Sequence, residues 1–213
     1  MEGYKMNDEK YTIRNETPSD FAETENLVRE AFWNVYRPGC LEHYVLHIMR
    51  NSKNFVKDLD FVMEKDKKLI GQVVYTRAQI QADDGRIIPI LTMGPIGILP
   101  AYKRKGYGKA LLDYSLKKAT ALGAGAVCFE GNIAFYGKSG FVIASTMGIH
   151  YHGEPRENEV PYFLCKELIP GYLSKVEGFF EQPLIGFIDN AAAEEFDKHF
   201  PYKEKERLPG QLA

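Results

Sequence analysis

The chain has 213 residues, 45% hydrophobic and 26% charged, which is enough to bury the core of a folded domain. This composition excludes a disordered chain, and the lack of Gly-X-Y periods, heptads or solenoid repeats excludes fibrous and repeat architectures. The 27 basic residues nearly balance the 29 acidic ones. No global field therefore favours nucleic acid or an anionic membrane, so any anion site must be local.

Several features bear on the compartment. The uncharged stretch Ile87–Leu99 contains two prolines and two glycines and falls short of the roughly 20 apolar residues of a membrane-spanning helix. The charged residues near Met1 include no apolar signal core, so we expect a cytoplasmic protein. Cys40, Cys128 and Cys165 form no CxxC pair, which favours buried thiols in a reducing compartment.

The first part of the chain predicts two helices and a β-hairpin. A short strand at Tyr11–Arg14 precedes a helix at Pro18–Trp33, which has capping residues and a proline in its first turn. Apolar residues at spacings of three and four predict a second helix over Leu41–Met49. Alternating residues then predict paired strands at Asp60–Glu64 and Leu69–Thr76.

The middle of the chain predicts further sheet and one long helix. Ile87–Leu99 is a long apolar strand, and its internal glycines and prolines indicate a β-bulge at Gly94–Gly97. A helix follows from about Gly106 to Gly123. After it we expect, in order, a strand at Ala126–Glu130, a short helix at Asn132–Lys138, and strands at Phe141–Ser145 and Pro161–Leu168.

The pattern weakens after Leu168. One short helix is predicted near Asn190–His199, followed by a charged run at Lys203–Arg207. We therefore expect one domain over residues 1–168 and a C-terminal extension over residues 169–213.

The clearest chemical signal lies where the long strand ends and the long helix begins. The first turn of a helix presents unpaired N–H groups and the positive end of the helix dipole. Gly106 and Gly108 let an anion approach that backbone, and basic residues crowd the same loop. The pattern predicts a phosphate site, although a solvated basic loop is the alternative because Gly-x-Gly alone is a weak motif. The P-loop and Rossmann glycine patterns are both absent from the sequence.

Two segments carry a family resemblance. Lys103–Gly108 looks like the pyrophosphate signature [R/Q]-x-x-G-x-[G/A], with lysine keeping the charge but not the planar fork of arginine. Glu130–Phe141 resembles the segment FY-x-x-x-GF of the same family. Together the segments resemble the GNAT superfamily of acyl-CoA-dependent N-acetyltransferases, within a poorly characterised bacterial branch. The resemblance covers about residues 11–168 and is strongest over Met93–Phe141.

The resemblance implies an α/β (α+β) fold in which a mixed, mostly antiparallel sheet splays between two strands and is flanked by helices. It also implies acetyl-CoA as co-substrate and no metal. Pantetheine would pair with the backbone around Ile98 and Leu99 as a pseudo-strand. The pyrophosphate would lie over the N–H groups of Lys105, Gly106 and Gly108, with added charge from Lys103, Arg104 and Lys109.

The implied reaction is direct attack of a neutral amine on the acetyl thioester. A backbone N–H near Ile98 would hold the oxyanion. Tyr136 matches the family tyrosine that protonates the leaving thiolate, and the alternative is a core aromatic residue beside Phe135. Glu130, at the end of a strand, is the candidate general base, acting directly or through water, and the alternative is a carboxylate that caps the next helix.

Other polar and aromatic residues carry weaker signals. His43 and His47 lie four residues apart on a predicted helix, but without a third ligand they do not predict a metal site. Two further groups are candidates for acceptor contact, with turn or packing roles as alternatives: His150 and His152, and Trp33, Tyr36 and Arg37.

The most favoured function is transfer of an acetyl group from acetyl-CoA to an amine, either a small molecule or a protein lysine. The alternative is a catalytically silent acyl-CoA sensor or interaction protein. Nucleic-acid binding by the basic loop is disfavoured because too few aromatic residues interleave it. A homodimer would pair through the strand at Tyr162–Lys166 or through the C-terminal segment.

Overall fold

The computed structural model describes residues 3–6, 9–181, 183 and 188–211. Its centre is a mixed sheet with the strand order β1-β2-β3-β4-β5-β6-β9-β7, and β10 pairs with both β4 and β8. The β5–β6 and β8–β10 pairs are parallel, and the other recorded pairs are antiparallel. The strands are β1 (Gly3–Met6), β2 (Glu9–Asn15), β3 (Phe61–Lys65), β4 (Lys68–Ala82), β5 (Ile87–Ile98), β6 (Ala126–Glu130), β7 (Val142–Ile143), β8 (Ile149–Tyr151), β9 (Phe163–Glu167) and β10 (Gly178–Glu181).

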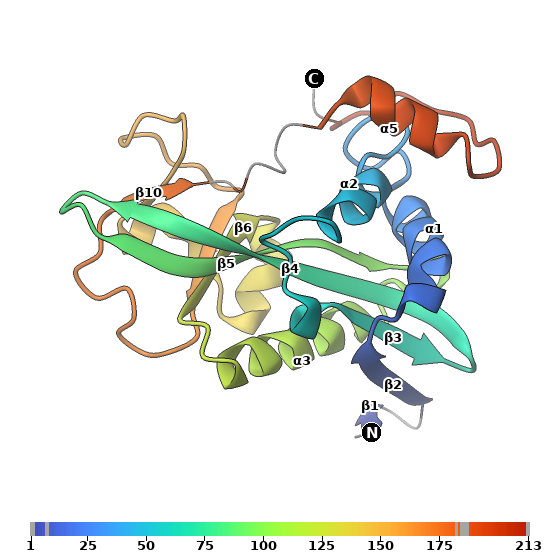
Figure 1. The fold of residues 1–213 in the computed structure, drawn as a ribbon, viewed down its shortest axis with the longest axis horizontal. Helices are drawn as coiled ribbons and strands as arrows, with labels where there is room; N and C mark the ends of the chain where they lie inside the picture. Colours follow the sequence, from blue (N-terminus) through green and yellow to red (C-terminus); the bar gives the residue numbers. More distant parts are fainter. Residues whose placement is uncertain (1–2, 7–8, 182, 184–187, 212–213) are drawn as a thin grey trace.

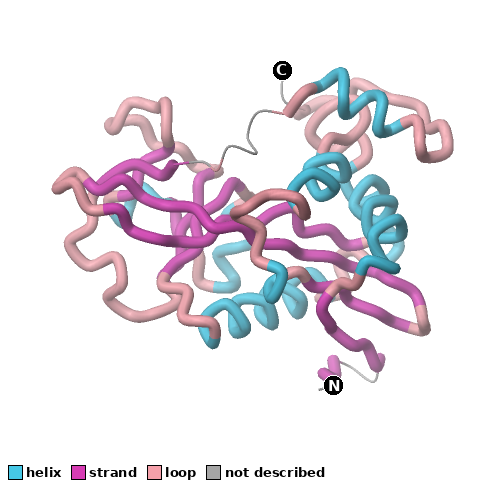
Figure 2. Tube along the Cα trace, in the orientation of Figure 1, coloured by secondary structure: helices cyan, strands magenta, loops and turns pink. Residues whose placement is uncertain are grey.

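Helices cover both faces of this sheet (Figures 1 and 2). They are α1 (Phe21–Phe32), α2 (Glu42–Met49), α3 (Tyr107–Ala121), α4 (Ile133–Tyr136) and α5 (Asn190–Asp197). Side chains alternate along β4, so Val73 and Tyr75 join the core under α3, whereas Val74 joins the core under α1 and α2. We call these two sides of the sheet the α3 face and the α2 face.

The first predicted helix is confirmed, with its expected cap. A 3₁₀ turn at Pro18–Asp20 leads into α1, and Thr17 and Asp20 form a capping box. The Thr17 N–H donates to the Asp20 carboxylate at 2.8 Å. The second predicted helix corresponds to α2, and the long helix to α3.

The sheet splays between β5 and β6. These parallel strands have a single recorded pair, Leu91 with Val127. Beyond it, β5 stays paired with β4 as far as Ile98, while β6 pairs with β9 as far as Glu130. The two strands therefore diverge towards their carboxyl ends, which is the splayed sheet that the family resemblance implied.

The predicted β-bulge is also confirmed. Tyr75 pairs with Met93 and Val73 pairs with Ile96, so β5 has one residue more than β4 over this stretch. The extra residue falls at Gly94 and Pro95, next to the point where β5 leaves β6. The bulge thus bends β5 at the splay.

Two strand predictions need correction. The strand expected at Phe141–Ser145 is only β7, because a 3₁₀ turn at Ala144–Met147 ends it. The strand β10 was not predicted, because its residues Gly178–Glu181 (GFFE) do not alternate between apolar and polar side chains. Because β10 pairs with β4, part of the segment 169–213 belongs to the sheet. The domain boundary at residue 168 stays a prediction.

Cys40, Cys128 and Cys165 are all buried free thiols, as expected. Within the part of the chain that the structure describes, no helix has the length and apolar character needed to cross a bilayer.

Candidate active site

A tight loop leads from β5 into α3. Arg104 and Gly106 both have left-handed backbones, with φ of 61° and 87°, so the chain turns sharply before the helix starts at Tyr107. Gly106 is the N-cap and has no side chain that could accept from the N–H groups of the first turn. This loop therefore presents the amino end of a 15-residue helix without a side-chain cap.

The basic residues of the loop point in different directions. The ammonium group of Lys103 donates to the Ala31 carbonyl of α1 at 2.7 Å, and burial lowers its pKa. Lys109 forms an exposed ion pair with Asp113 at 2.5 Å. Lys105 lies 5.7 Å from the ring centre of Tyr102, and its side chain is exposed like that of Arg104. Of the predicted phosphate cations, the loop thus presents Arg104 and Lys105, while Lys103 is engaged with α1.

Gly108 lies where three elements meet. A Cβ atom at this position would be 3.4 Å from Cζ of Phe135 on α4 and 3.6 Å from Cγ1 of Ile98 on β5. The start of α3, the end of β5 and α4 are therefore in close proximity. Glycine keeps that space open for a ligand that follows the backbone.

At the end of β5, the backbone N–H groups of Ile98 and Leu99 point in opposite directions. The Leu99 N–H donates to the Ile70 carbonyl at 2.9 Å, so it is used within the sheet. Amides alternate in direction along a strand, so the Ile98 N–H points away from β4 and towards the gap where β6 diverges. Of the two predicted positions, Ile98 offers its N–H group for pairing with a ligand in the splay.

Tyr136 ends α4 and lies in an aromatic cluster. Its ring centre is 4.6 Å from that of Phe129 on β6 and 4.8 Å from that of Phe135. Burial raises the pKa of Tyr136. The hydroxyl therefore stays protonated at neutral pH, which is the form that a general acid needs.

Glu130 is exposed at the carboxyl end of β6. Its Oε1 accepts a hydrogen bond from the Tyr151 hydroxyl at 2.5 Å, and Tyr151 belongs to β8. The alternative role of Glu130 as a helix cap is wrong, because Asn132 caps α4 by accepting from the Ala134 N–H at 2.9 Å.

A pocket of about 250 Å³ opens beside Glu130. Its walls come from α2, β4, the bulge of β5, the end of β6, and β10 with residues after it. Its lining includes Val45, Met49, Met93, Phe129, Glu130 and Phe180. Phe129, the residue before Glu130, also lines this pocket, and its ring packs against that of Tyr136.

Comparison with known families agrees with several of these features. Residues 58–143 match the model of the acetyltransferase (GNAT) domain. This stretch of the chain is similar to a GNAT domain. The match spans β3 to β7, which includes the loop before α3, the splay and Tyr136. No curated protein sequence matches the chain.

Solved structures share the GNAT fold with this chain. The Escherichia coli GNAT family N-acetyltransferase YhbS, solved in complex with CoA, has a TM-score of 0.72 at 22% identity, covering 86% of this chain and 95% of that one. A Brucella melitensis GNAT family acetyltransferase, solved with acetyl-CoA, gives 0.66 at 22% identity, covering 83% and 98%. The Escherichia coli ribosomal-protein-S18-alanine N-acetyltransferase gives 0.53 at 17% identity, covering 75% and 94%.

Three of the remaining candidates for acceptor contact lie outside the pocket beside Glu130, namely Trp33, Arg37 and His150. Another candidate, Tyr36, is close enough to Tyr136 to add to the effect of burial in raising the pKa of that tyrosine. The Trp33 indole N–H donates to the Glu204 carbonyl at 2.9 Å, and Arg37 donates to Asn190 at 3.2 Å. His150 packs on Phe179, with ring centres 5.7 Å apart. These contacts are with the C-terminal segment, so they do not bring the side chains to Glu130.

His43 and His47 do not point towards a common metal site. His43 faces α5, and His47 faces α1. His43 is fully buried beside Asp197 and Phe196 of α5, and burial lowers its pKa to about 4. His47 pairs with Glu25 at 2.9 Å. Among the described residues, no group of three histidine, cysteine, aspartate or glutamate side chains could hold a metal ion.

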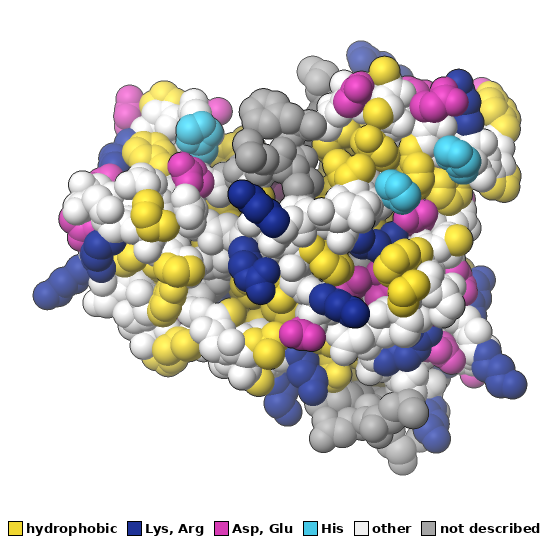
Figure 3. All heavy atoms as spheres, viewed as in Figure 1, with side chains coloured by type: hydrophobic (Ala, Val, Ile, Leu, Met, Phe, Trp, Pro, Cys, Tyr) yellow, Lys and Arg dark blue, Asp and Glu magenta, His cyan; other side chains and the backbone are white. Residues whose placement is uncertain are grey.

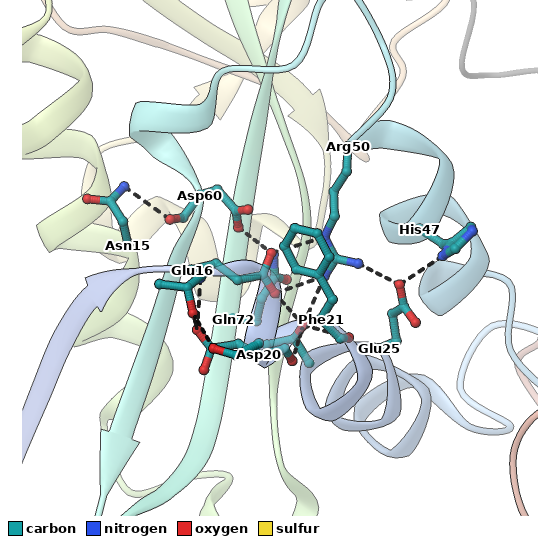
Figure 4. Close-up of polar contacts among 12 residues, drawn as sticks. Asn15, Glu16, Asp20, Phe21, Glu25, His47, Arg50, Asp60 and Gln72 are labelled. Atoms are coloured by element: carbon teal, nitrogen blue, oxygen red, sulfur yellow. Dashed lines mark hydrogen bonds and ion pairs between the residues drawn. The ribbon is translucent and has the colours of Figure 1, made fainter.

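The α2 face of the sheet contains a buried charge cluster that no sequence motif indicated. Arg50, just after α2, donates to Glu16 at 2.8 and 3.0 Å and to Glu25 at 2.5 Å (Figure 4). Its guanidinium carbon lies 4.0 Å from the ring centre of Phe21. Since Arg50 follows Met49, this cluster fixes the carboxyl end of α2 and with it one wall of the pocket.

Asp60 lies next to this cluster and is nearly fully buried. It accepts from the Gln72 amide at 3.4 Å (Figure 4). Burial, and then the neighbouring Glu16 carboxylate, raise the pKa of Asp60 to about 8. The raised pKa favours the protonated form of Asp60 in the folded chain.

The C-terminal segment is fastened to the other side of α1 and α2. Arg29 of α1 is 2% exposed and donates to Asp197 of α5 at 2.6 and 3.3 Å. Lys203 pairs with Glu30 at 2.7 Å. Figure 3 shows hydrophobic side chains gathered between α2 and α5, where Phe196 packs against Tyr44. The side of α2 that faces away from the sheet is therefore packed against residues from the end of the chain.

Proposed function

We propose that the chain is an N-acetyltransferase that moves an acetyl group from acetyl-CoA to an amine within a ternary complex. The observation that carries this proposal is the divergence of β5 and β6 directly beside the uncapped start of α3. A sheet with this gap provides an extended ligand with backbone partners on one side and a helix amino end for its phosphates. Two of the structures that share the fold were solved with CoA or acetyl-CoA.

The residues present fit a CoA group. Its pyrophosphate would lie over the N–H groups of Lys105, Gly106 and Gly108, with Arg104 adding charge from the same loop. The pantetheine arm would run along β5 and pair with the Ile98 N–H. The space that a Cβ atom at Gly108 would enter, between Phe135 and Ile98, supports this path.

The proposed step is direct acyl transfer. The amine nitrogen attacks the thioester carbon, the C–N bond forms, and the C–S bond breaks to release CoA as a thiol. Tyr136, which like any tyrosine is protonated at neutral pH, gives its proton to the leaving sulfur. Glu130 accepts the proton that the amine loses, directly or through water, and the Ile98 N–H stabilises the oxyanion. Proton release to water restores Glu130, and Tyr136 regains its proton from water.

Thermal unfolding in the presence of ligands tests the cofactor site. Acetyl-CoA or CoA at 100 times its dissociation constant should stabilise the folded chain by about 2.7 kcal/mol, whereas ATP and NAD should give smaller shifts. Equal shifts with ATP would indicate a general anion loop and would overturn the proposal.

Tyr136→Phe separates an enzyme from a sensor. Removing the proton donor should lower CoA release, followed with a thiol reagent, by about 100-fold or more, with little change in the Kd for acetyl-CoA. Tyr162→Phe is the control, because Tyr162 is exposed and outside the pocket. A wild-type chain that binds acetyl-CoA but releases no CoA with any amine would support the sensor instead.

A further inference from the structure

The pocket beside Glu130 has a single charged group in a mostly apolar wall. Among its described lining residues, Glu130 alone is ionisable. The apolar residues Val45 and Met49 of α2 and Phe180 of β10 line it, together with Met93 of β5 and the uncharged Thr76 and Thr92. One carboxylate above an apolar wall matches a ligand with one cationic end and an apolar body.

Glu130 has a carboxylate oxygen left for such a ligand. Its Oε1 accepts from the Tyr151 hydroxyl at 2.5 Å, which fixes the carboxylate at the pocket rim. A carboxylate offers two oxygens with about four acceptor sites, so Oε2 can accept from an ammonium group. Tyr151 therefore acts as a positioning residue for Glu130.

The position of the pocket suits an acceptor amine. Phe129 and Glu130 are successive residues of β6, so their side chains point to opposite faces of the strand. Phe129 contacts Tyr136 in the aromatic cluster that packs with α3, while Glu130 reaches Tyr151 on the other side. An amine held by Glu130 would thus approach the splay from one face of the strand, while Tyr136 lies near the other face, where it can reach the leaving sulfur.

The size of the pocket suits a compact acceptor. A volume of about 250 Å³ lies just below the range of roughly 300 to 1,000 Å³ that is typical of small-molecule sites. It accommodates a compact group, and the described lining has no second acidic residue to meet a second ammonium group of a polyamine.

From this juxtaposition of Glu130 with the apolar side chains of α2, β5 and β10, we propose that the acceptor is a small primary amine bearing one compact apolar group. The proposal rests on the acetyltransferase function proposed above and adds the class of acceptor. The ammonium form binds to Glu130, and the apolar group packs against Val45, Met49 and Phe180. Loss of one proton to Glu130 then gives the neutral amine that attacks the thioester.

A panel of amines tests the class directly. CoA release from acetyl-CoA is measured with 2-phenylethylamine, 3-methylbutylamine, 2-methoxyethylamine, ethanolamine, 1,4-diaminobutane and a short lysine peptide. Each methylene in an apolar pocket changes discrimination by about 10-fold or more, so kcat/KM should be about 100-fold higher for the first two amines than for ethanolamine. The pair 3-methylbutylamine and 2-methoxyethylamine controls for length.

Matched variants locate the effect in the pocket. Val45→Ser should reduce the preference for 3-methylbutylamine over 2-methoxyethylamine by about 10-fold, whereas Val142→Ser, at an exposed position outside the pocket, should not. Glu130→Gln should raise KM for every amine about 10-fold or more, and Glu157→Gln is its control. Tyr151→Phe should raise KM for amines while the Kd for acetyl-CoA stays the same.

The outcomes distinguish the two proposals. A preference for apolar amines that Val45→Ser weakens supports the acceptor class. Faster turnover of ethanolamine, 1,4-diaminobutane or the lysine peptide would overturn that class and leave acetyl transfer intact. Binding of acetyl-CoA without turnover of either apolar amine would also overturn the class. Failure to bind acetyl-CoA at all would overturn the proposed function, and the acceptor class with it.

Discussion

The two faces of the sheet are built in different ways. On the α3 face, the loop before α3, the end of β5, α4 and Tyr136 all come from one stretch of chain, residues 98–141. On the α2 face, the pocket depends on α2, on the cluster around Arg50 and on β10 and α5 from the end of the chain. The first face uses backbone amides and aromatic packing, whereas the second is held by buried ion pairs between distant segments.

This difference separates the two halves of the proposed reaction. The proposed acetyl-CoA site needs only a short continuous segment of chain with a fixed backbone conformation. A binding site for the acceptor is assembled from distant segments, so substitutions there can alter the choice of amine without touching the cofactor backbone. Breaking the ion pairs should therefore affect stability and acceptor use, and changes in the loop should affect CoA binding.

The largest effect is expected from Arg50→Met. It leaves Glu16 and Glu25 without their cation in a buried setting, and breaking a buried pair in this way costs about 3 to 5 kcal/mol. Urea denaturation measures the loss. Arg207→Met, at an exposed position, is the control and should change stability by less than about 0.5 kcal/mol. Equal stability of the two variants would contradict the role of the cluster.

Asp197→Asn should have the next largest effect. Arg29 keeps its charge at 2% exposure but loses the carboxylate that pairs with it, so we expect a loss of about 2 to 3 kcal/mol. Hydrogen exchange should show faster exchange in α5 than in α3. Asp66→Asn, whose side chain is 82% exposed, provides the comparison. Unchanged protection of α5 would show that the pair does not fasten it.

Asp60→Asn should change the pH dependence of stability. The pKa of Asp60 is raised to about 8 in the folded chain and is about 4 when unfolded. Between these values the folded chain keeps a proton that the unfolded chain releases, so stability falls as pH rises through this window. Asp60→Asn should remove this contribution to the decline between pH 5 and 8, whereas Asp58→Asn, exposed two residues earlier, should keep it. Parallel curves for both variants would argue against a protonated Asp60.

Gly108→Ala is expected to have the smallest effect on stability. The added Cβ would make ordinary contact with Phe135 at 3.4 Å, and alanine stabilises a helix by about 0.5 to 1 kcal/mol relative to glycine. The Kd for acetyl-CoA should rise at the same time, because the methyl group occupies space beside the backbone. Calorimetric titration measures this, with Lys117→Ala on the exposed side of α3 as control. A Gly108→Ala chain with unaltered affinity would move the proposed ligand path away from this position.

The features that the sequence could predict are the local ones of the α3 face, and those it could not predict are contacts between distant segments on the α2 face. The bulge, the loop before α3 and the short helix with Tyr136 were predictable because each depends on residues adjacent in the chain. The pairing of Arg29 with Asp197 was not, since only the folded chain brings α1 and α5 together. Periodicity also could not indicate β10, because its residues GFFE have no apolar–polar alternation.

The role of Lys103 shows why a motif does not fix the direction of each side chain. The sequence predicts that Lys103 adds charge at the phosphate, yet its ammonium group donates to the Ala31 carbonyl at 2.7 Å. The last carbonyls of a helix have no partners within it and attract cations, so the end of α1 is a competing acceptor. Nothing in the spacing of Lys103–Gly108 indicates that α1 ends nearby.

The pairing of β10 with β4 has a consequence for the order in which the molecule forms. β4 pairs with β3 and β5, its neighbours in sequence, but its last residue pairs with Gly178, far along the chain. Contacts between distant residues form late, and during synthesis the amino-terminal part emerges first. We therefore expect a nascent chain to assemble its central hairpins well before Phe180 closes the pocket beside Glu130.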